Sequence, residues 1–166
     1  MSSVTADQAR PAGTARRLYS DAERARRDAT PWTLVQGILA PLQFLVFVVS
    51  LVLVVRYLAT GAGYEAATVS ILIKTGVLYL IMVTGAIWEK VVFGQYLFAP
   101  AFFWEDVFSF AVIGLHTAYV YALLTNLLSP DGLMLLALAA YATYVINAGQ
   151  FIWKLRLARL DAESRA

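Results

Sequence analysis

The chain has 166 residues, 60% of them hydrophobic and 14% charged, with a formal net charge of +2. This composition is too apolar for an ordinary soluble domain and indicates an integral membrane protein. The chain has no cysteine and only one histidine, which excludes disulfides, thiolate catalysis and a two-histidine zinc site. It also lacks the repeats of aromatic and basic residues that would suggest a nucleic-acid partner.

The first 30 residues are predicted to stay outside the membrane. Residues 1–18 are mostly Ser, Ala, Thr and Arg, and we expect them to form a disordered tail. Ser20 followed by Glu23 is a capping-box signature, which predicts a short charged helix on the membrane surface. Thr30-Pro31 then supplies an N-cap and a first-turn proline for the long apolar segment that follows.

Four apolar segments are each long enough to cross a bilayer, which takes about 20 helical residues. They cover residues 32–58, 66–88, 103–128 and 132–153. Residues 61–63 and 129–131 carry the turn and capping residues that separate neighbouring spans. The predicted fold class is all-α integral membrane, with one domain over residues 19–166 in which four transmembrane helices form an antiparallel bundle.

The orientation follows from the basic residues near the ends of the spans. Six arginines precede Trp32, and four basic residues occur from Lys154 onward. The turns near Gly61 and Ser129 carry acidic residues and no lysine. Because basic residues accumulate on the cytoplasmic side, we expect both termini to be cytoplasmic, together with the connection between the second and third spans.

Each predicted span carries one polar stripe, formed by positions about seven or eleven residues apart. We expect the four stripes to face a shared interior. The predicted inward residues are Gln36, Gln43 and Ser50 in the first span; Thr75, Tyr79, Met82, Ala86 and Glu89 in the second; Glu105, Ser109, Val112, His116 and Tyr119 in the third; and Thr143, Asn147, Gln150 and Lys154 in the fourth.

Three carboxylates lie where the second span ends and the third begins. Glu89 follows a tryptophan, and Glu105 and Asp106 follow another. Carboxylates beside a hydrocarbon layer are costly unless they are paired, hydrated or used, so they mark a candidate functional site. The alternative is an aromatic belt with interfacial charges at two helix ends.

Several long segments together resemble the 3-vinyl bacteriochlorophyllide hydratase family of photosynthetic bacteria. The resemblance covers about residues 19–162. It rests on Arg-Arg-Asp at 26–28, Trp-Thr-Leu-Val-Gln-Gly-Ile-Leu-Ala-Pro-Leu-Gln-Phe at 32–44, Val-Thr-Gly-Ala-Ile-Trp-Glu-Lys at 83–90, Phe-Ala-Pro-Ala-Phe-Phe-Trp-Glu-Asp at 98–106 and Tyr-Ala-Thr-Tyr-Val-Ile-Asn-Ala at 141–148. It implies an enzyme of bacteriochlorophyll biosynthesis, a hydro-lyase that adds water to the C3 vinyl group of a chlorophyllide or bacteriochlorophyllide to give a 1-hydroxyethyl group.

Such a hydration needs a proton donor for the terminal vinyl carbon and a group that orients water, and it needs no redox cofactor. We expect Glu105 to be the acid, because an apolar environment and a neighbouring carboxylate both favour its protonated form. Asp106 or Glu89 would then hold the water. The predicted substrate contacts are Trp88, Phe103 and Trp104 for the flat macrocycle, Lys90 or Lys154 for its propionate, His116, Asn147 and Gln150.

His116 has two interpretations, a hydrogen-bonded core residue or an axial contact to the magnesium of the substrate; no metal of the protein's own is expected. By helical rise it should lie roughly 15 Å deeper than Glu105.

Two other functional classes stay open from the residues alone. A non-catalytic membrane protein that binds or hands on tetrapyrroles could use the same aromatic side chains. A small solute or proton transporter is a second alternative, although acids gathered at one surface do not form a continuous relay. The expected partners are the chlorophyllide substrate, water and the lipids of the bacterial inner (intracytoplasmic) membrane. Homo-oligomers and contacts with other enzymes of the pathway stay open.

Overall fold

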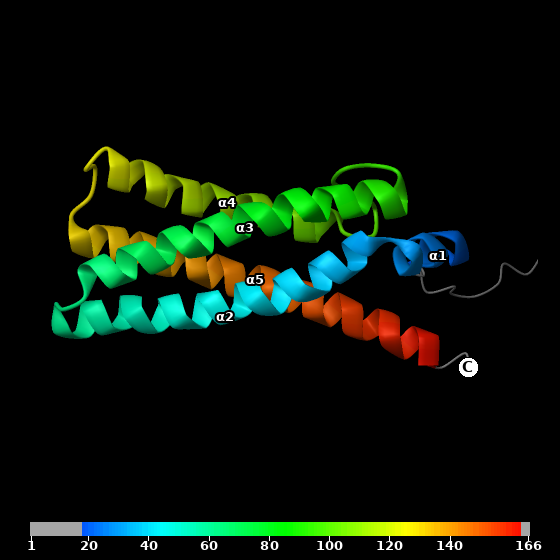
Figure 1. Ribbon diagram of the computed structural model, residues 1–166, viewed down its shortest axis with the longest axis horizontal. Coiled ribbons are helices and arrows are strands. Elements are labelled where there is room, and N and C mark those ends of the chain that lie inside the picture. The colour runs from blue at the N-terminus through cyan, green and yellow to red at the C-terminus, as the bar shows by residue number, and fades with distance from the viewer. Residues whose placement is uncertain (1–17, 164–166) are drawn as a thin grey trace, which may run out of the picture.

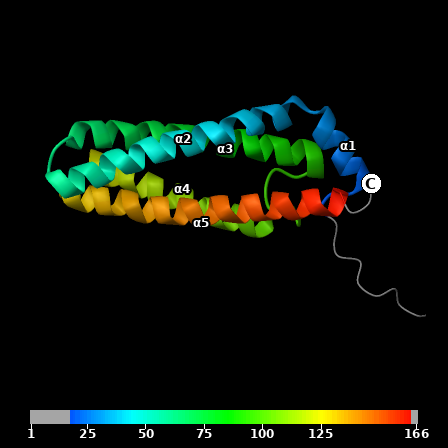
Figure 2. The same ribbon diagram turned by 90° about the horizontal axis from the view of Figure 1, so that it is seen from below.

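The computed structural model describes residues 18–163 and the side chains of residues 18–160, so the predicted tail lies almost wholly outside the described residues. The described part is all-helical. Its helices are α1 (Asp21–Ala29), α2 (Pro31–Thr60), α3 (Tyr64–Phe93), α4 (Phe103–Leu124) and α5 (Pro130–Glu163). The four long helices lie side by side along one axis (Figures 1 and 2), and each is long and apolar enough to cross a membrane.

The predicted helix starts are confirmed by their hydrogen bonds. Ser20 and Glu23 form the reciprocal capping box of α1. Because the Ser20 backbone N–H donates to the Glu23 carboxylate, the pKa of Glu23 is lowered and the cap stays formed at neutral pH. The Thr30 hydroxyl accepts from the Trp32 backbone N–H, with Pro31 in the first turn of α2. Ser129 accepts in the same way from Gly132 at the start of α5.

Three helix ends differ from the prediction. α3 continues to Phe93 because Glu89 turns into the bundle and does not end the apolar segment, and Gly94 then ends the helix in the left-handed conformation at φ 86°. α4 ends at Leu124, four residues before the predicted end, and Asn126 adopts a left-handed φ of 52°. α5 runs ten residues past Trp153, since its Lys- and Arg-rich continuation is made of good helix formers.

The core lies along the centre of the bundle and is mixed apolar and aromatic. Its buried members come from all four long helices and include Phe47, Val54, Ile71, Leu78, Val112, Tyr119, Met134, Tyr141 and Tyr144. The inward stripe predicted for α4 is confirmed, because all five of its residues are at most 5% exposed. Two other inward predictions are wrong. Tyr79 is 39% exposed and hydrogen-bonds the Thr117 hydroxyl, while the neighbouring Leu78 points inward. The Thr143 hydroxyl donates to the Ala139 carbonyl of its own helix, and Tyr144 takes the inward position.

One end of the bundle carries α1, the connection between α3 and α4, and the last described turns of α5 (Figure 1). We call it the acidic end, because Glu89, Glu105 and Asp106 lie there. Arg26 anchors α1 to this end by donating from Nε to the Val92 carbonyl at 2.8 Å. The Tyr19 ring packs in parallel on Phe93, with centroids 5.7 Å apart. Both ends of the described chain therefore lie near the three carboxylates.

Candidate functional site

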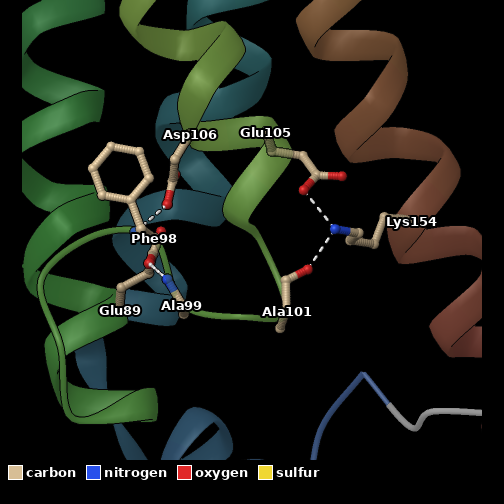
Figure 3. A network of polar contacts seen from close by, with 7 residues as sticks. All are labelled: Glu89, Phe98, Ala99, Ala101, Glu105, Asp106 and Lys154. Atoms are coloured by element: carbon tan, nitrogen blue, oxygen red, sulfur yellow. Dashed lines mark hydrogen bonds and ion pairs between the residues drawn. The ribbon is translucent and has the colours of Figure 1, made fainter.

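The connection between α3 and α4, residues 94–102, is shaped around two carboxyl groups. Phe98 in this segment has a φ of 59°, in the left-handed region that bulky residues rarely adopt. The backbone N–H of Phe98 donates to Asp106 Oδ2 at 2.6 Å, and that of Ala99 donates to Glu89 Oε2 at 3.3 Å (Figure 3). Two successive N–H groups thus bind carboxylates from two different helices, and these bonds offset the strain at Phe98.

Glu89 and Asp106 form a buried carboxyl pair. Their side chains are 5% and 3% exposed and lie close enough to hydrogen-bond each other. An ionised carboxylate only accepts hydrogen bonds, so a bond between two carboxyl groups requires a proton on one of them. Two adjacent negative charges in a buried site would repel strongly, which favours the same singly protonated state. The arrangement can therefore store one exchangeable proton.

Glu105 has a different partner. Its Oε2 lies 2.5 Å from Lys154 Nζ, and the Glu105 side chain is 7% exposed against 26% for Lys154. Lys154 also donates to the Ala101 carbonyl (Figure 3). The ammonium group therefore ties α5 to the first turn of α4 and to the connection before it. Because this carboxylate is already engaged by the ammonium group of Lys154, it suits a positioning or electrostatic role better than proton donation.

The predicted macrocycle contacts fall into two different surroundings. Trp88 is enclosed at the acidic end, where its Nε1 donates to the Thr33 hydroxyl at 2.9 Å and its ring contacts Phe93 and Phe102. Phe103 and Trp104, by contrast, are 44% and 65% exposed. Among the predicted rings, only these two present a free surface at the start of α4.

The predicted propionate contacts differ in the same way. Lys90 is exposed, with its ammonium group on the Gly94 carbonyl at 2.7 Å and near the Tyr96 ring. Lys154 is engaged with Glu105. Lys90 is therefore the freer of the two cations.

The remaining predicted contacts lie inside the bundle. His116 is fully buried, and its Nδ1 donates to the Val112 carbonyl at 2.8 Å, which leaves Nε2 as an unpartnered lone pair. Asn147 donates from Nδ2 to the Ser109 hydroxyl at 2.9 Å. Gln150 keeps a buried side-chain oxygen without a hydrogen-bond partner. His116 is eleven residues from Glu105 on α4, or about 16 Å along the axis, so it does not join the carboxyl groups directly.

Two residues at or near the core were not predicted to be special. Lys74 is fully buried in α3, with its Nζ 3.7 Å from the centre of the Tyr144 ring. Its position as a lysine inside an apolar segment was visible in the sequence, but nothing there indicated the aromatic partner. The conformation of Phe98 had no sequence signal, because left-handed backbone usually appears at glycine or asparagine.

Comparison with known proteins gives consistent matches over nearly the whole chain. A family profile described as 2-vinyl bacteriochlorophyllide hydratase matches residues 19–157. The chain is 76% identical over 155 residues to the protein of that name from Cereibacter sphaeroides, covering 93% of this chain and 96% of the relative. It is 79% identical over 148 residues to the protein of the same name from Rhodobacter capsulatus, covering 89% and 85%. No solved structure matches significantly.

Proposed function

The chain belongs to the 2-vinyl bacteriochlorophyllide hydratase family, and we propose that its buried carboxyl groups carry out the hydration that gives the family its name. The reaction adds water to a vinyl substituent of a bacteriochlorophyllide and gives a 1-hydroxyethyl group. The 2-vinyl group of the family name and the C3 vinyl group of the sequence analysis are the same substituent. The observation that carries the assignment of residues is the carboxyl pair of Glu89 and Asp106, held by the Phe98 and Ala99 N–H groups.

In the proposed reaction, the carboxyl pair gives up one proton and later regains one from water. The protonated carboxyl group gives its proton to the terminal vinyl carbon, and the positive charge that develops on the inner carbon is delocalised by the macrocycle. Water adds to the inner carbon. The pair, now carrying two negative charges, takes one proton from that water and returns to its starting state. One site thus serves as acid and then as base, as general acid-base catalysis allows.

The sequence analysis predicted Glu105 as the acid, whereas in this proposal the proton donor is the carboxyl pair of Glu89 and Asp106. Glu105 and Lys154 instead hold the start of α4 in place and set the local charge. Lys90 is proposed to bind the substrate propionate, because its ammonium group is exposed at the same end of the bundle. Phe103 and Trp104 are proposed to contact the macrocycle.

The test of the activity is hydration by purified protein in detergent or lipid nanodiscs. With a 3-vinyl substrate in heavy-oxygen water, the hydroxyethyl oxygen should carry the label, and in D2O one deuterium should appear on the new methyl group. Binding of the pigment without any labelled product would instead support a tetrapyrrole carrier and would remove the proposed activity.

His116→Gln is expected to weaken apparent substrate affinity more than turnover. The histidine lies about 16 Å below Glu105 along α4, so it is too far away to transfer the reacting proton. It is fully buried, bonds the Val112 carbonyl and packs beside Tyr141, so its replacement acts on substrate affinity through the packing of the bundle. The measurement is KM and kcat for folded protein, with pigment binding followed separately. A loss confined to kcat, with binding intact, would assign the histidine to the chemical step.

We further propose an antiparallel bundle in the bacterial inner (intracytoplasmic) membrane, with both termini and the 94–102 connection in the cytoplasm. The support is the excess of arginine and lysine at the acidic end, compared with Glu65 and Asp131 near the other turns. A protease should remove tags at either terminus only when it has access to the cytoplasmic face of the membrane. Termini on opposite sides would contradict the arrangement and would require an odd number of spans.

A further inference from the structure

Four aromatic rings at the acidic end form a continuous exposed surface. They are Phe98, Phe103, Trp104 and Phe110, with exposed fractions of 39%, 44%, 65% and 45%. Phe98 and Phe110 stack in parallel, with centroids 5.5 Å apart and an interplanar angle of 10°. Phe98 also contacts Phe103 at 5.7 Å, and Phe103 contacts Trp104 at 5.5 Å. We call these four residues the outer aromatic surface.

This surface lies directly over one member of the carboxyl pair. Phe103, Asp106 and Phe110 share one stripe of α4, because they are three, four and seven residues apart. The Phe98 ring contacts the phenylalanine on each side of Asp106, while the Phe98 N–H donates to the Asp106 carboxylate. Three aromatic rings of the outer aromatic surface therefore lie beside the Asp106 member of the carboxyl pair.

The second aromatic cluster at this end is not available in the same way. It contains Tyr19, Trp88, Phe93, Phe102 and Phe151, whose rings pack on one another. Tyr19 and Phe102 are only 4% and 2% exposed. This cluster attaches α1 and α5 to the bundle, so its rings already have protein partners.

The composition of the outer aromatic surface differs from that of an interfacial belt. Belts at the membrane surface are formed by Trp and Tyr, whose polar tips bond water and headgroups. Three of the four rings here are Phe, which has no polar tip. Phe98 is also held in a strained left-handed backbone conformation by its bond to Asp106, which an anchoring role would not require.

We propose that the outer aromatic surface is the docking site for the flat tetrapyrrole macrocycle, which reaches the carboxyl pair sideways from the lipid phase. The inference rests on the proposed function for the identity of the occupant. A planar conjugated ring stacks on such a surface, and its vinyl substituent, at the macrocycle edge, can pass between the rings to Asp106. The centre of the four-helix bundle then serves for support and is not the substrate path.

The experiment measures equilibrium binding of a macrocycle whose vinyl group is replaced by ethyl, so that no reaction can occur. Phe110→Leu and Trp104→Leu remove one ring each and retain apolar side chains. Each should weaken binding by about 3- to 10-fold, the range expected for one aromatic contact, and the double variant should weaken it further. The matched control is Phe44→Leu, since Phe44 is 56% exposed on α2 and its ring contacts only Phe47 among the described rings.

Equal losses of binding in the Phe44 and Phe110 variants would show that the effect is not specific to the outer aromatic surface and would overturn the proposed docking site. Unchanged binding in the Phe110 and Trp104 variants would overturn the proposal even if the wild-type protein hydrates its substrate. Conversely, ring-dependent binding of the ethyl analogue without hydration of the vinyl compound would keep the docking site and overturn the proposed activity. Because Trp104 is 65% exposed, its replacement tests the surface even where a Phe110 variant folds poorly.

Discussion

Asp106→Asn should lower the hydration rate per folded protein by about 10²- to 10⁴-fold, the range that general acid-base groups contribute. Asparagine retains the shape of the side chain and an oxygen that can accept from the Phe98 N–H, but it cannot share a proton with Glu89. Glu89→Gln should cause a loss of similar size for the same reason. The measurement is the initial rate of hydroxyethyl product formation, with binding of the ethyl analogue determined separately.

The two changes should not be additive, because either one removes the shared proton. The double variant should therefore be nearly as active as each single variant. Asp131→Asn is the matched control, since that carboxylate is exposed near the opposite end of the bundle, where it accepts a hydrogen bond from the Tyr57 hydroxyl. Near-normal rates in both pair variants would end the acid-base assignment, and two multiplicative losses would show separate roles.

Lys154→Met should destabilise the folded protein by about 3 kcal/mol, because it leaves the buried Glu105 carboxylate without its counter-charge. For a chain of this size, that corresponds to a fall in Tm of about 6 to 12 °C. Changing Glu105→Gln in the same protein should recover most of the loss, since no uncompensated charge then remains. Thermal unfolding in detergent gives the comparison, and Lys90→Met is the control for removing an exposed ammonium group at the same end of the bundle.

The same double variant separates the two roles considered for Glu105. If Glu105 only positions α4 through Lys154, the double variant should recover activity as well as stability. If Glu105 is the proton donor, as its place between Trp104 and Asp106 suggested, stability should return while activity stays low. The second outcome would return the acid role from the carboxyl pair to Glu105.

The helices could be predicted because their signals are local. Apolar segments of sufficient length, the Ser20 and Thr30 caps and the glycines after α2 each act within a few residues. The inward face of α4 was also predictable, since helical periodicity alone places His116 and Ser109 on the side of Glu105. The prediction from periodicity was wrong at Tyr79, because the inward position is one residue earlier. One residue corresponds to a rotation of about 100° around the helix, so the Tyr79 side chain points outward.

The candidate site could be located from the sequence, but its division into two groups could not. Three carboxylates near tryptophans marked the region. Which carboxylate pairs with Lys154, and which two share a proton, depends on where α5 lies beside α4 and on the path of residues 94–102. These are long-range relations. The left-handed conformation of Phe98 is a tertiary effect too, because its cost is offset by a carboxylate eight residues away.

The burial of Lys74 also constrains how the protein enters the membrane. A lysine in the middle of a spanning helix costs about 2.5 to 3.5 kcal/mol during insertion through the translocon, so α3 is a poor candidate to insert alone. Its amine packs against Phe47 of α2, which is already synthesised, and against Tyr141 and Tyr144 of α5, which emerges from the ribosome only after α4. Insertion of α2 and α3 as a pair gives the amine its first aromatic partner, and completion of its surroundings waits for α5. During biogenesis, a chain stalled before α5 therefore leaves the Lys74 amine in the hydrocarbon layer without two of its three aromatic partners.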